Sequence, residues 1–490
     1  MLSVIQKAKE HLKGRAILAD GRETIYEELI FRSAALARIL LDDKPDLREE
    51  RVSFMVTPGE DYVITLWAIW QAGGIAVPLC TDHPVPSLKY AITDSGSSIL
   101  VVSPTFHEMM WPLTEELGMR FLIISKQLED QAGTLPEVSA NRRAMILYTS
   151  GTTNLPKGVV TTHANITAQI DTLVKAWKWR SDDHILCVLP LHHVHGIINV
   201  VSCSLWSGAC CEFSHFQPDR VFQIFLQGKV NVFMAVPTIY FKLTSHWETL
   251  PEEKRSVVSE CLRKFRLMVS GSAALPVSLL EKWKKISHHT LLERYGMTEL
   301  GMAISNPYEG ERKPGHVGQP LPGVQIRLCN EKDEPAGEGP GEIQVKGSNV
   351  FLEYWKKPDA TRLAFTADGW FRTGDTAVLD KGYYRILGRT SVDIIKSGGY
   401  KISALEVEEV LRTHPAIADC SVVGLEDDEW GEVVGAAIIC KGPLMESELV
   451  SWMKKQMPAY KIPRRLVWVN DLPRNTMGKV TKNEVKKKFV

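Results

Sequence analysis

Residues 1–140 alternate between short apolar runs and longer segments with helical spacing of apolar residues, and this alternation constrains the fold most. Arg51–Val56 is an apolar run of strand length. Tyr26–Leu41 before it and Asp61–Ala72 after it carry apolar residues at helical spacing, and Gly73-Gly74 ends the second helix. This order of segments is typical of a parallel sheet covered on both faces. The sequence therefore predicts an α/β fold.

The same order of segments continues beyond residue 140. Arg143–Leu147 is another strand-length apolar run, and we expect a helix over Val159–Trp179. Asn231–Leu243 predicts a buried strand and then a helix beginning at Pro237, because proline fits the first helical turn. Arg266–Pro276 predicts a strand followed by a turn of small residues.

Size and charge narrow the class of protein. A chain of 490 residues can form two or three domains with a large core. Lys plus Arg and Asp plus Glu both number 58, so overall charge gives no reason to expect nucleic acid or an anionic membrane as a partner. The longest run without charge or histidine, Tyr62–Thr81, contains glycines and Pro78 in its middle, so we expect buried core and no membrane span.

The cysteines and the N-terminal residues indicate a reducing compartment. The nine cysteines include no Cys-x-x-Cys spacing, and Cys210 and Cys211 are adjacent, which favours free thiols over a disulfide framework. Met1–Glu10 lacks the continuous apolar core of a secretory signal and the usual composition of a transit peptide. We therefore expect a cytoplasmic protein or a processed protein of the mitochondrial matrix.

Tyr148–Gly158 has the composition of a phosphate-binding loop. A glycine-containing turn offers backbone N–H groups, and here Ser and Thr hydroxyls and the Lys157 ammonium add further donors. The loop is not a Walker A motif, because Lys157 follows Pro156 and precedes Gly158. The alternative is an ordinary polar loop between a strand and a helix.

Two later motifs suggest nucleotide recognition. In Leu291–Glu299, Tyr295 can present its ring to a purine, and Thr298 and Glu299 can meet phosphate oxygens and a magnesium ion. Asp375, at the end of a Gly-Trp-Phe-Arg-Thr-Gly-Asp run, can accept hydrogen bonds from both ribose hydroxyls. The alternative for Glu299 alone is a surface carboxylate.

Histidines and lysines in unusual contexts complete the set of candidates. His192, His193 and His195 suggest zinc, but no Cys, His or acidic pair lies nearby at ligand spacing, so packed histidines are the preferred interpretation of the first two. Lys479 lies in a glycine-containing loop, whereas the basic residues 486–488 are typical of a solvated helix face.

These motifs, in this order along the whole chain, resemble the acyl-adenylate-forming superfamily, which includes acyl-CoA synthetases, luciferases and peptide-synthetase adenylation domains. One departure is Asn154, where the phosphate loop of the superfamily usually has glycine. The resemblance implies a large N-terminal multi-sheet α/β domain at 1–389 and a smaller, mobile C-terminal α/β domain at 390–490, with a hinge just after Arg389. It also implies ATP, Mg²⁺ and coenzyme A as cofactors, with a small-molecule carboxylic acid as substrate and a monomer or weak homo-oligomer as the assembly.

The resemblance also assigns roles to residues of this chain. It implies catalytic roles for Lys479, Thr298 and Glu299, with Glu299 as the metal ligand. Residues that would bind ATP or coenzyme A are Thr149, Ser150, Gly151, Thr152, Thr153, Lys157, Gly271, Ser272, Arg294, Tyr295, Gly296, Asp375, Arg389, Gly398 and Gly399. Residues that would line the acyl pocket are His195, Lys242, Ser270, Arg294 and Met297.

Within the superfamily, the chain is similar to the malonyl-CoA synthetases, most densely over residues 192–196, 231–243, 266–276 and 291–299. Malonate brings a second carboxylate into the pocket, and a buried carboxylate needs a cation. Lys242 and Arg294 are the candidates, and methylmalonate is a further possible substrate. The alternatives are a Lys242 side chain that reaches solvent and an ion pair between Arg294 and Glu293.

Two other functions compete with malonate ligation. A ligase for medium-chain or aromatic acids belongs to the same reaction class. A carrier-loading or partner-binding module that has lost thioester synthesis belongs to another, but it would lack Lys479 or carry a fused carrier segment, and this chain retains the lysine and shows no such segment.

Overall fold

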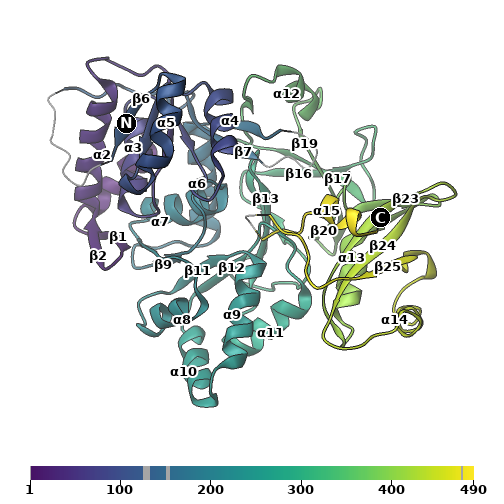
Figure 1. Cartoon of the computed structure of the whole chain (residues 1–490). Coiled ribbons are helices and arrows are strands. Elements are labelled where there is room, and N and C mark those ends of the chain that lie inside the picture. The colour runs from purple at the N-terminus through teal and green to yellow at the C-terminus, as the bar shows by residue number, and fades with distance from the viewer. Residues whose placement is uncertain (1, 125–132, 150–154, 476–477, 490) are drawn as a thin grey trace.

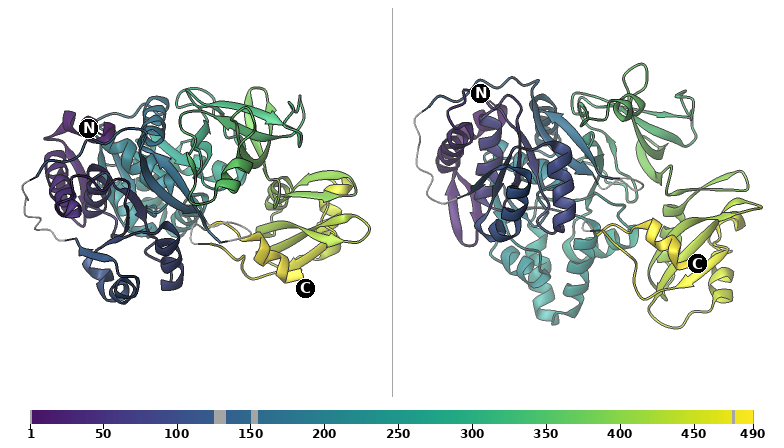
Figure 2. Two further views of the ribbon diagram at one scale, coloured as in Figure 1. Left: turned by 90° about the horizontal axis from the view of Figure 1, so that it is seen from above. Right: turned by 45° about the horizontal axis from the view of Figure 1, so that its top comes forward.

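The computed structural model describes residues 2–124, 133–149, 155–475 and 478–489. Within these ranges the strands form four sheets. The strands and helices from β21 onward form a smaller unit at one side of the molecule (Figure 1), and both views of Figure 2 show it beside the larger part. The division predicted between residues 389 and 390 falls between β20 and β21.

A nine-stranded sheet runs through the middle of the larger part. Five of its strands, from β13 through β12, β11 and β9 to β10, pair in parallel, as does β1 with β10, whereas the remaining pairs at both ends are antiparallel. The carboxyl ends of the parallel strands therefore share one edge. In spatial order the strands are β15 (Gln319–Pro320), β14 (Gly301–Ser305), β13 (Leu292–Met297), β12 (Leu267–Ser270), β11 (Val232–Ala235), β9 (His184–Cys187), β10 (Cys210–Phe213), β1 (Arg15–Ala19) and β2 (Arg22–Ile25).

A seven-stranded sheet contains the strand predicted at 51–56. Its central side chains alternate between two apolar clusters, since Phe54 and Val101 pack with α2 and α3 whereas Met55 and Leu100 pack with α4 and α5. Helices thus cover both faces, which confirms the predicted α/β arrangement. In order the strands are β18 (Glu353–Tyr354), β8 (Lys157–Thr162), β7 (Arg143–Thr149), β4 (Ile75–Pro78), β3 (Arg51–Met55), β5 (Ile99–Val102) and β6 (Arg120–Ile123).

The segment after the phosphate loop differs from the prediction. Lys157–Thr162 forms strand β8, antiparallel to β7, and the helix begins only at His163. The run of Val159, Val160 and two threonines is β-branched, which favours a strand. Thr162 then caps the helix, because its hydroxyl accepts from the Asn165 N–H and the Asn165 side chain accepts from the Thr162 N–H.

Two antiparallel arrangements complete the fold. The four-stranded sheet contains β16 (Gln325–Cys329), β17 (Gly341–Lys346), β19 (Phe371–Asp380) and β20 (Tyr383–Arg389). In the smaller unit, β25 pairs in parallel with β24 and the other pairs are antiparallel. Its strands are β21 (Ile394–Ser397), β22 (Tyr400–Ser403), β23 (Ile417–Asp427), β24 (Gly431–Cys440) and β25 (Arg465–Trp468).

Helices connect most of these strands, and α2, α3 and α9 confirm the helices predicted at those positions. An additional π-helix, His195–Ser202, follows β9 and is buried along its whole length. The α-helices are α1 (Ser3–Ala8), α2 (Tyr26–Leu41), α3 (Glu60–Gln71), α4 (Val85–Ser95), α5 (His107–Leu117), α6 (His163–Ala176), α7 (Cys203–Trp206), α8 (Pro218–Leu226), α9 (Pro237–Thr249), α10 (Glu252–Arg263), α11 (Val277–Ser287), α12 (Pro358–Ala364), α13 (Ala404–Arg412), α14 (Glu446–Met453) and α15 (Lys482–Lys486).

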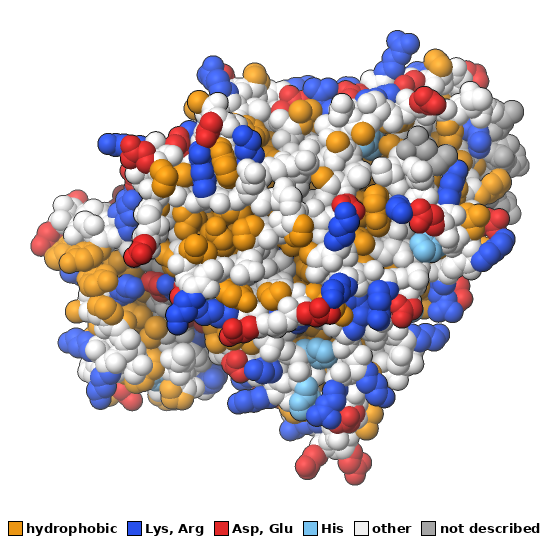
Figure 3. All heavy atoms as spheres, turned by 180° about the vertical axis from the view of Figure 1, so that it is seen from behind, with side chains coloured by type: hydrophobic (Ala, Val, Ile, Leu, Met, Phe, Trp, Pro, Cys, Tyr) orange, Lys and Arg blue, Asp and Glu red, His pale blue; other side chains and the backbone are white. Residues whose placement is uncertain are grey.

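The surface carries charges of both signs, and the cysteines are free thiols. Figure 3 shows Lys and Arg side chains interspersed with Asp and Glu side chains over the face opposite to that of Figure 1. All nine cysteines lie in the described part of the chain, and each is a free thiol. Among the described residues, no helix has the length and apolar character that crossing a membrane requires.

Candidate active site

Three of the predicted site residues, together with Thr238, lie at the carboxyl ends of the parallel strands of the nine-stranded sheet. His195 follows β9, Thr238 follows β11, Ser272 follows β12 and Thr298 follows β13. Segments that leave parallel strands at one edge of a sheet lie close together, and ligands of open α/β sheets bind at such edges. The topology therefore brings together motifs that are far apart in the sequence.

A small-residue turn after β12 brings Ser272 between His195 and Arg294. The Ser272 hydroxyl lies 3.2 Å from His195 Nδ1 and accepts from Arg294 Nη2 at 3.3 Å. Ser272 has a φ of 69°, in the left-handed region. A Cβ atom on Gly271 would lie 2.5 Å from Arg294 Cζ, so only glycine lets the guanidinium pack this closely on the turn. Gly271, Ser272, His195 and Arg294 therefore lie together.

Burial keeps His195 neutral. It lowers the pKa of His195 well below its ordinary value, and the positive charge of Arg294 lowers it further. The Ser272 hydroxyl accepts from Arg294, and its own O–H is free to donate to Nδ1 of the neutral His195 ring. In that tautomer the proton of the ring is on Nε2, and His195 presents an N–H donor there.

Three buried polar atoms of this cluster have no hydrogen-bond partner among the described residues: His195 Nε2, Arg294 Nε and the Ser270 hydroxyl. The side chain of Arg294 also forms no ion pair with a described carboxylate. Burial lowers the pKa of Arg294 to about 9, so the guanidinium remains charged at neutral pH. Glu293 does not pair with it, and Oε1 of its carboxyl group accepts from the Gly315 N–H at 3.1 Å instead. A buried cation and two further polar groups without partners suit an anionic ligand.

A second cluster joins Tyr295, Asp375 and Arg389. The Tyr295 hydroxyl donates to Asp375 Oδ2 at 2.6 Å, and Arg389 Nε donates to Asp375 Oδ1 at 3.2 Å. Asp375 and Arg389 are paired across β19 and β20. The three residues predicted to meet adenine and ribose therefore lie together, although they come from distant segments. A Cβ on the neighbouring Gly296 would approach the Gly301 carbonyl oxygen to 1.8 Å, which only glycine avoids.

A third cluster contains Glu299 and Lys157. The Tyr354 hydroxyl donates to Glu299 Oε1 at 2.9 Å, and the Lys157 ammonium lies 4.9 Å from the centre of the Tyr354 ring. Burial raises the pKa of Glu299, and its hydrogen bond with Tyr354 and the charge of Arg389 oppose that rise. Glu299 thus shares one electrostatic environment with the Asp375 cluster.

Lys479 lies in what we call the Lys479 turn, the described residues 474–475 and 478–482, which touches the larger part of the molecule. The Lys479 N–H donates to Asn475 Oδ1 at 3.0 Å, and Arg474 and Val480 form a β-bridge within the turn. A Cβ on Gly478, whose φ is 74°, would lie 2.7 Å from the Thr238 hydroxyl. The turn that carries Lys479 therefore packs against the start of α9, at the strand edge where the other clusters lie.

Other predicted residues have different surroundings. Lys242 is exposed on α9, and its ammonium lies 5.9 Å from the centre of the Phe216 ring. Gly398 and Gly399 form the two-residue turn between β21 and β22, with φ values of 54° and 83° that a type I′ turn requires. Thr149 ends β7, and Met297 and Thr298 are half-buried at the end of β13. Ser150, Gly151, Thr152 and Thr153 lie outside the described residues, as does Asn154.

The histidines give no metal site among the described residues, where no group of three or more potential ligands occurs. Burial lowers the pKa of His192 to about 2 and that of His193 to about 4, so both rings are neutral. Sequence reasoning missed Tyr354 and Thr238. A tyrosine after Glu353 and a threonine after Pro237 have no distinguishing pattern, and only the fold brings them to Glu299 and Gly478.

Comparison with known protein families agrees with this geometry. The profile of the AMP-binding enzyme family matches residues 5–355, and that of the AMP-binding enzyme C-terminal domain matches residues 406–479. The chain belongs to the AMP-binding enzyme family. In this AMP-binding enzyme, the clusters around Arg294, Asp375 and Glu299 and the turn with Lys479 lie near one another, as residues of one active site would.

Individual relatives of this AMP-binding enzyme extend the comparison. It is 46% identical to the mitochondrial malonate–CoA ligase ACSF3 of Homo sapiens, over 97% of this chain and 90% of that one. A crystal structure of ATP-bound MatB from Rhodopseudomonas palustris has a TM-score of 0.91 with 31% identity and 99% coverage of both chains, and apo MatB has a TM-score of 0.81 with 30% identity and the same coverage. The o-succinylbenzoate coenzyme A synthetase MenE of Bacillus subtilis, in complex with ATP and a magnesium ion, gives 0.86 with 26% identity, over 99% of both chains.

Proposed function

We propose that this enzyme ligates malonate to coenzyme A at the expense of ATP, through a malonyl-adenylate, and releases AMP and pyrophosphate. The observation that carries the proposal is Arg294, a buried cation without a carboxylate partner among the described residues, in a member of the AMP-binding enzyme family. The identity with a malonate–CoA ligase over nearly the whole chain supports the choice of acid. Methylmalonate, which has the same two carboxylates, is the second candidate substrate.

Arg294 would bind the carboxylate of malonate that does not react. Its Nε–H, His195 Nε2 and the Ser270 hydroxyl are buried polar groups of this cluster that have no partner among the described residues, and a carboxylate accepts several hydrogen bonds. Met297 would add apolar contact beside the acid. Lys242 is the weaker candidate for the carboxylate, because its side chain is exposed and a solvated ammonium binds an anion weakly.

The Asp375 cluster would bind the nucleoside. The Asp375 carboxylate would accept hydrogen bonds from the ribose hydroxyls, held in place by Tyr295 and Arg389. The Tyr295 ring beside Gly296, together with the Gly271–Ser272 turn, would border adenine. Lys157, Thr149 and residues 150–153 would bind the β- and γ-phosphates, and Thr298 would add a hydroxyl.

Magnesium fits the Glu299 position. Mg²⁺ prefers carboxylate and phosphate oxygens, and Glu299 offers a buried carboxylate oriented by the Tyr354 hydroxyl. Burial raises the pKa of Glu299, and a bound cation would favour its charged form. When bound, Mg²⁺ would neutralise the negative charge of the phosphates, and Glu299 would hold it there.

In the first half-reaction, a carboxylate oxygen of malonate attacks the α-phosphorus of ATP, and the bond to the bridging oxygen of pyrophosphate breaks. Two anions must approach each other for this step. Lys479 would contact both and stabilise the charge that grows at the α-phosphate, a form of electrostatic stabilisation that depends on preorganised groups. The contact of the Gly478 turn with Thr238 supports such a position, as does the closer similarity to ATP-bound than to apo MatB.

In the second half-reaction, the sulfur of coenzyme A attacks the acyl carbon and AMP leaves with the bonding electron pair. Lys479 has no part in this step. We infer that the unit at 390–490 rotates relative to residues 1–389 about a hinge just after Arg389, which withdraws Lys479 and brings the Gly398–Gly399 turn to the pantetheine path. The glycine pair supports this, because a turn without side chains leaves room for a narrow ligand.

The remaining assignments follow the relatives and the surface. We propose a monomer or weak homo-oligomer in the cytoplasm or mitochondrial matrix, and the mitochondrial human relative and the nine free thiols support a reducing compartment of this kind. A ligase for medium-chain or aromatic acids is the alternative function, and it would leave the buried Arg294 without a partner, which is costly.

A panel of acids tests the proposal. Malonate, methylmalonate, acetate, octanoate and benzoate are incubated with ATP and Mg²⁺, with and without coenzyme A, and pyrophosphate, AMP and thioester are measured. We expect the highest kcat/KM with malonate or methylmalonate. A preference for octanoate or benzoate would contradict the choice of acid, and absence of AMP with every acid would contradict the reaction class.

A further inference from the structure

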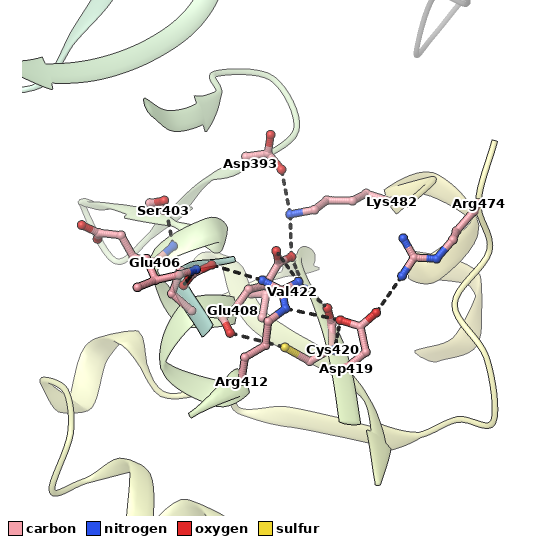
Figure 4. Close-up of polar contacts among 12 residues, drawn as sticks. Asp393, Ser403, Glu406, Glu408, Arg412, Asp419, Cys420, Val422, Arg474 and Lys482 are labelled. Carbon is pink, nitrogen blue, oxygen red and sulfur yellow. Dashed lines mark hydrogen bonds and ion pairs between the residues drawn. The ribbon is translucent and has the colours of Figure 1, made fainter. Parts of the chain in front are cut away.

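The turn that carries Lys479 is anchored by an ammonium that is itself buried. Lys482, three residues further on, begins α15, and its side chain is 9% exposed. Its Nζ lies 2.7 Å from Asp393 Oδ1 and 3.0 Å from Glu408 Oε1 (Figure 4). Asp393 belongs to the segment between β20 and β21, and Glu408 belongs to α13. One lysine therefore ties the end of the Lys479 turn to two other elements.

The beginning of the same turn is anchored by an arginine. Arg474 Nη1 donates to the Gly478 carbonyl oxygen at 2.8 Å, and Arg474 Nη2 donates to Asp419 Oδ2 at 2.6 Å. Arg412 lies 3.3 Å from Asp419 Oδ1 through Nε and 3.5 Å from Glu408 Oε2 through Nη2. Figure 4 shows these charges side by side, so that both ends of the turn join one network of ion pairs.

The network also reaches the segment that follows the nucleotide-binding cluster. Asp393 Oδ2 accepts from the Arg389 N–H at 2.9 Å, and the guanidinium of Arg389 pairs with Asp375. A Cβ on Gly388 would lie 2.3 Å from Asp393 Cβ, so glycine is required for this close approach. Asp393 thus connects Lys482 on one side with the backbone of a predicted ribose-binding residue on the other.

The charges of the Lys482 pair are stable at neutral pH. Burial alone would raise the pKa of Asp393, but the Lys482 ammonium brings it below its usual value. Burial alone would lower the pKa of Lys482, but the carboxylates of Glu408 and Asp393 raise it. Each group keeps its charge because the other is there, and loss of either partner would leave an uncompensated buried charge.

We propose that Lys482 is a positioning residue for the adenylation half-reaction: through its ion pairs with Asp393 and Glu408 it fixes the turn that presents Lys479, with Arg474 as its counterpart at the other end. This inference rests on the proposed function. Lys482 lies among carboxylates of the smaller unit and acts through the backbone of the turn. Lys482 therefore increases the rate of adenylation, the step that uses Lys479.

The test compares two half-reactions of the full-length enzyme. Adenylation is measured as malonate-dependent exchange of labelled pyrophosphate into ATP, and thiolysis as coenzyme A consumption with supplied malonyl-adenylate. We expect Lys482→Met to lower the maximal exchange rate by about 10-fold to 100-fold, since small displacements of a catalytic group have effects of this size. We expect thiolysis and the KM for ATP to change less than about twofold.

Three further variants complete the design. Lys482→Arg restores a cation and is expected to recover most of the exchange rate. Lys487→Met makes the same change at an exposed lysine of the same segment, 2.7 Å from Glu484, and is expected to have no effect. Arg474→Met removes the anchor at the exposed end of the turn and is expected to slow exchange selectively even if Lys482→Met does not fold.

The outcomes separate this inference from the proposed function. Equal loss of exchange and thiolysis in Lys482→Met and Arg474→Met, or full exchange activity in both, would overturn the positioning role while the wild type remains an active ligase. Absence of malonate-dependent exchange in the wild type would overturn the proposed function itself.

Discussion

Two buried cations, Arg294 at the strand edge and Lys482 in the smaller unit, have opposite surroundings. Lys482 lies between two carboxylates that raise its pKa, whereas burial lowers the pKa of Arg294 to about 9 and no described carboxylate pairs with it. Lys482 is therefore a cation paired within the protein, whereas Arg294 is a cation that suits an anionic ligand. The comparison also separates two regions, the strand edge with a buried cation that we propose binds the acid, and the smaller unit with the exposed Lys479 that we propose acts on it.

The largest effect on the reaction is expected from Lys479, which the smaller unit would present to the strand edge. Lys479→Ala should lower the rate of adenylation by about 1000-fold, because the charge that develops at the α-phosphate loses its preorganised partner. Thiolysis of supplied malonyl-adenylate should remain within about threefold of the wild type. The two half-reactions are measured separately. An equal loss of adenylation and of thiolysis in Lys479→Ala would contradict a role of Lys479 in adenylation alone.

The next effect concerns the unpaired cation. Arg294→Leu should lower kcat/KM for malonate by about 100-fold, since the second carboxylate would be buried without a partner. Butanoate is of similar size and lacks that carboxylate. The kcat/KM of Arg294→Leu for butanoate should therefore be no lower than that of the wild type. Lys242→Met is the matched control at the exposed cation and should reduce malonate use by less than about threefold. The reverse ranking of the two variants would make Lys242 the malonate-binding cation.

A stability measurement tests why Glu293 is not the partner of Arg294. Neighbouring side chains on a strand point to opposite faces, and burial raises the pKa of Glu293 to about 8. The folded state therefore keeps a proton that the unfolded chain loses above its ordinary pKa of about 4.5. Stability from this group is complete below that pH and is lost as the pH rises towards 8.

Glu293→Gln should remove that dependence. Between pH 6 and 8 the free energy of unfolding of the wild type should fall by about 2 kcal/mol more than that of the variant, measured by urea denaturation. Glu309→Gln, at an exposed carboxylate paired with Lys178, is the control and should behave like the wild type. Parallel curves for wild type and Glu293→Gln would show that Glu293 is ionised and available to Arg294.

The smallest effect concerns the ribose carboxylate. Asp375→Asn keeps an acceptor but loses the charge that pairs with Arg389, so the KM for ATP should rise about 10-fold. The KM for malonate should stay within about twofold of the wild type, because Asp375 lies with Tyr295 and Arg389 in the cluster that we propose binds the nucleoside. Initial rates at varied ATP and malonate concentrations give the two KM values. An equal rise in both would contradict separate binding of ATP and malonate by the two clusters.

Some of this arrangement could be predicted from the sequence. Helix α2 begins and ends at the predicted residues, because apolar spacing and flanking breakers define a helix locally. The strand β8 could not be separated from the following helix by apolar content alone, although its β-branched run was a usable signal. Composition also pointed to Tyr295 and Asp375, but their contact joins residues 80 positions apart, and local patterns carry no such information.

Contacts between distant segments account for the rest. Tyr354 and Glu299 are 55 residues apart, and Lys482 meets Asp393 only because two segments of the smaller unit fold together. The sequence also could not decide whether Lys242 or Arg294 would bind the second carboxylate of malonate, since each is a single cation in an apolar run. Burial distinguishes them, and burial is a property of the fold.

The most direct measurement of the central claim is exchange of labelled pyrophosphate into ATP by the purified enzyme with malonate, Mg²⁺ and no coenzyme A. Because malonyl-adenylate forms before coenzyme A takes part, label should enter ATP only when malonate is present, and Lys479→Ala should slow the exchange by about 1000-fold. Exchange that requires coenzyme A, or no exchange with any acid offered, would contradict an adenylate formed by Lys479 at this site.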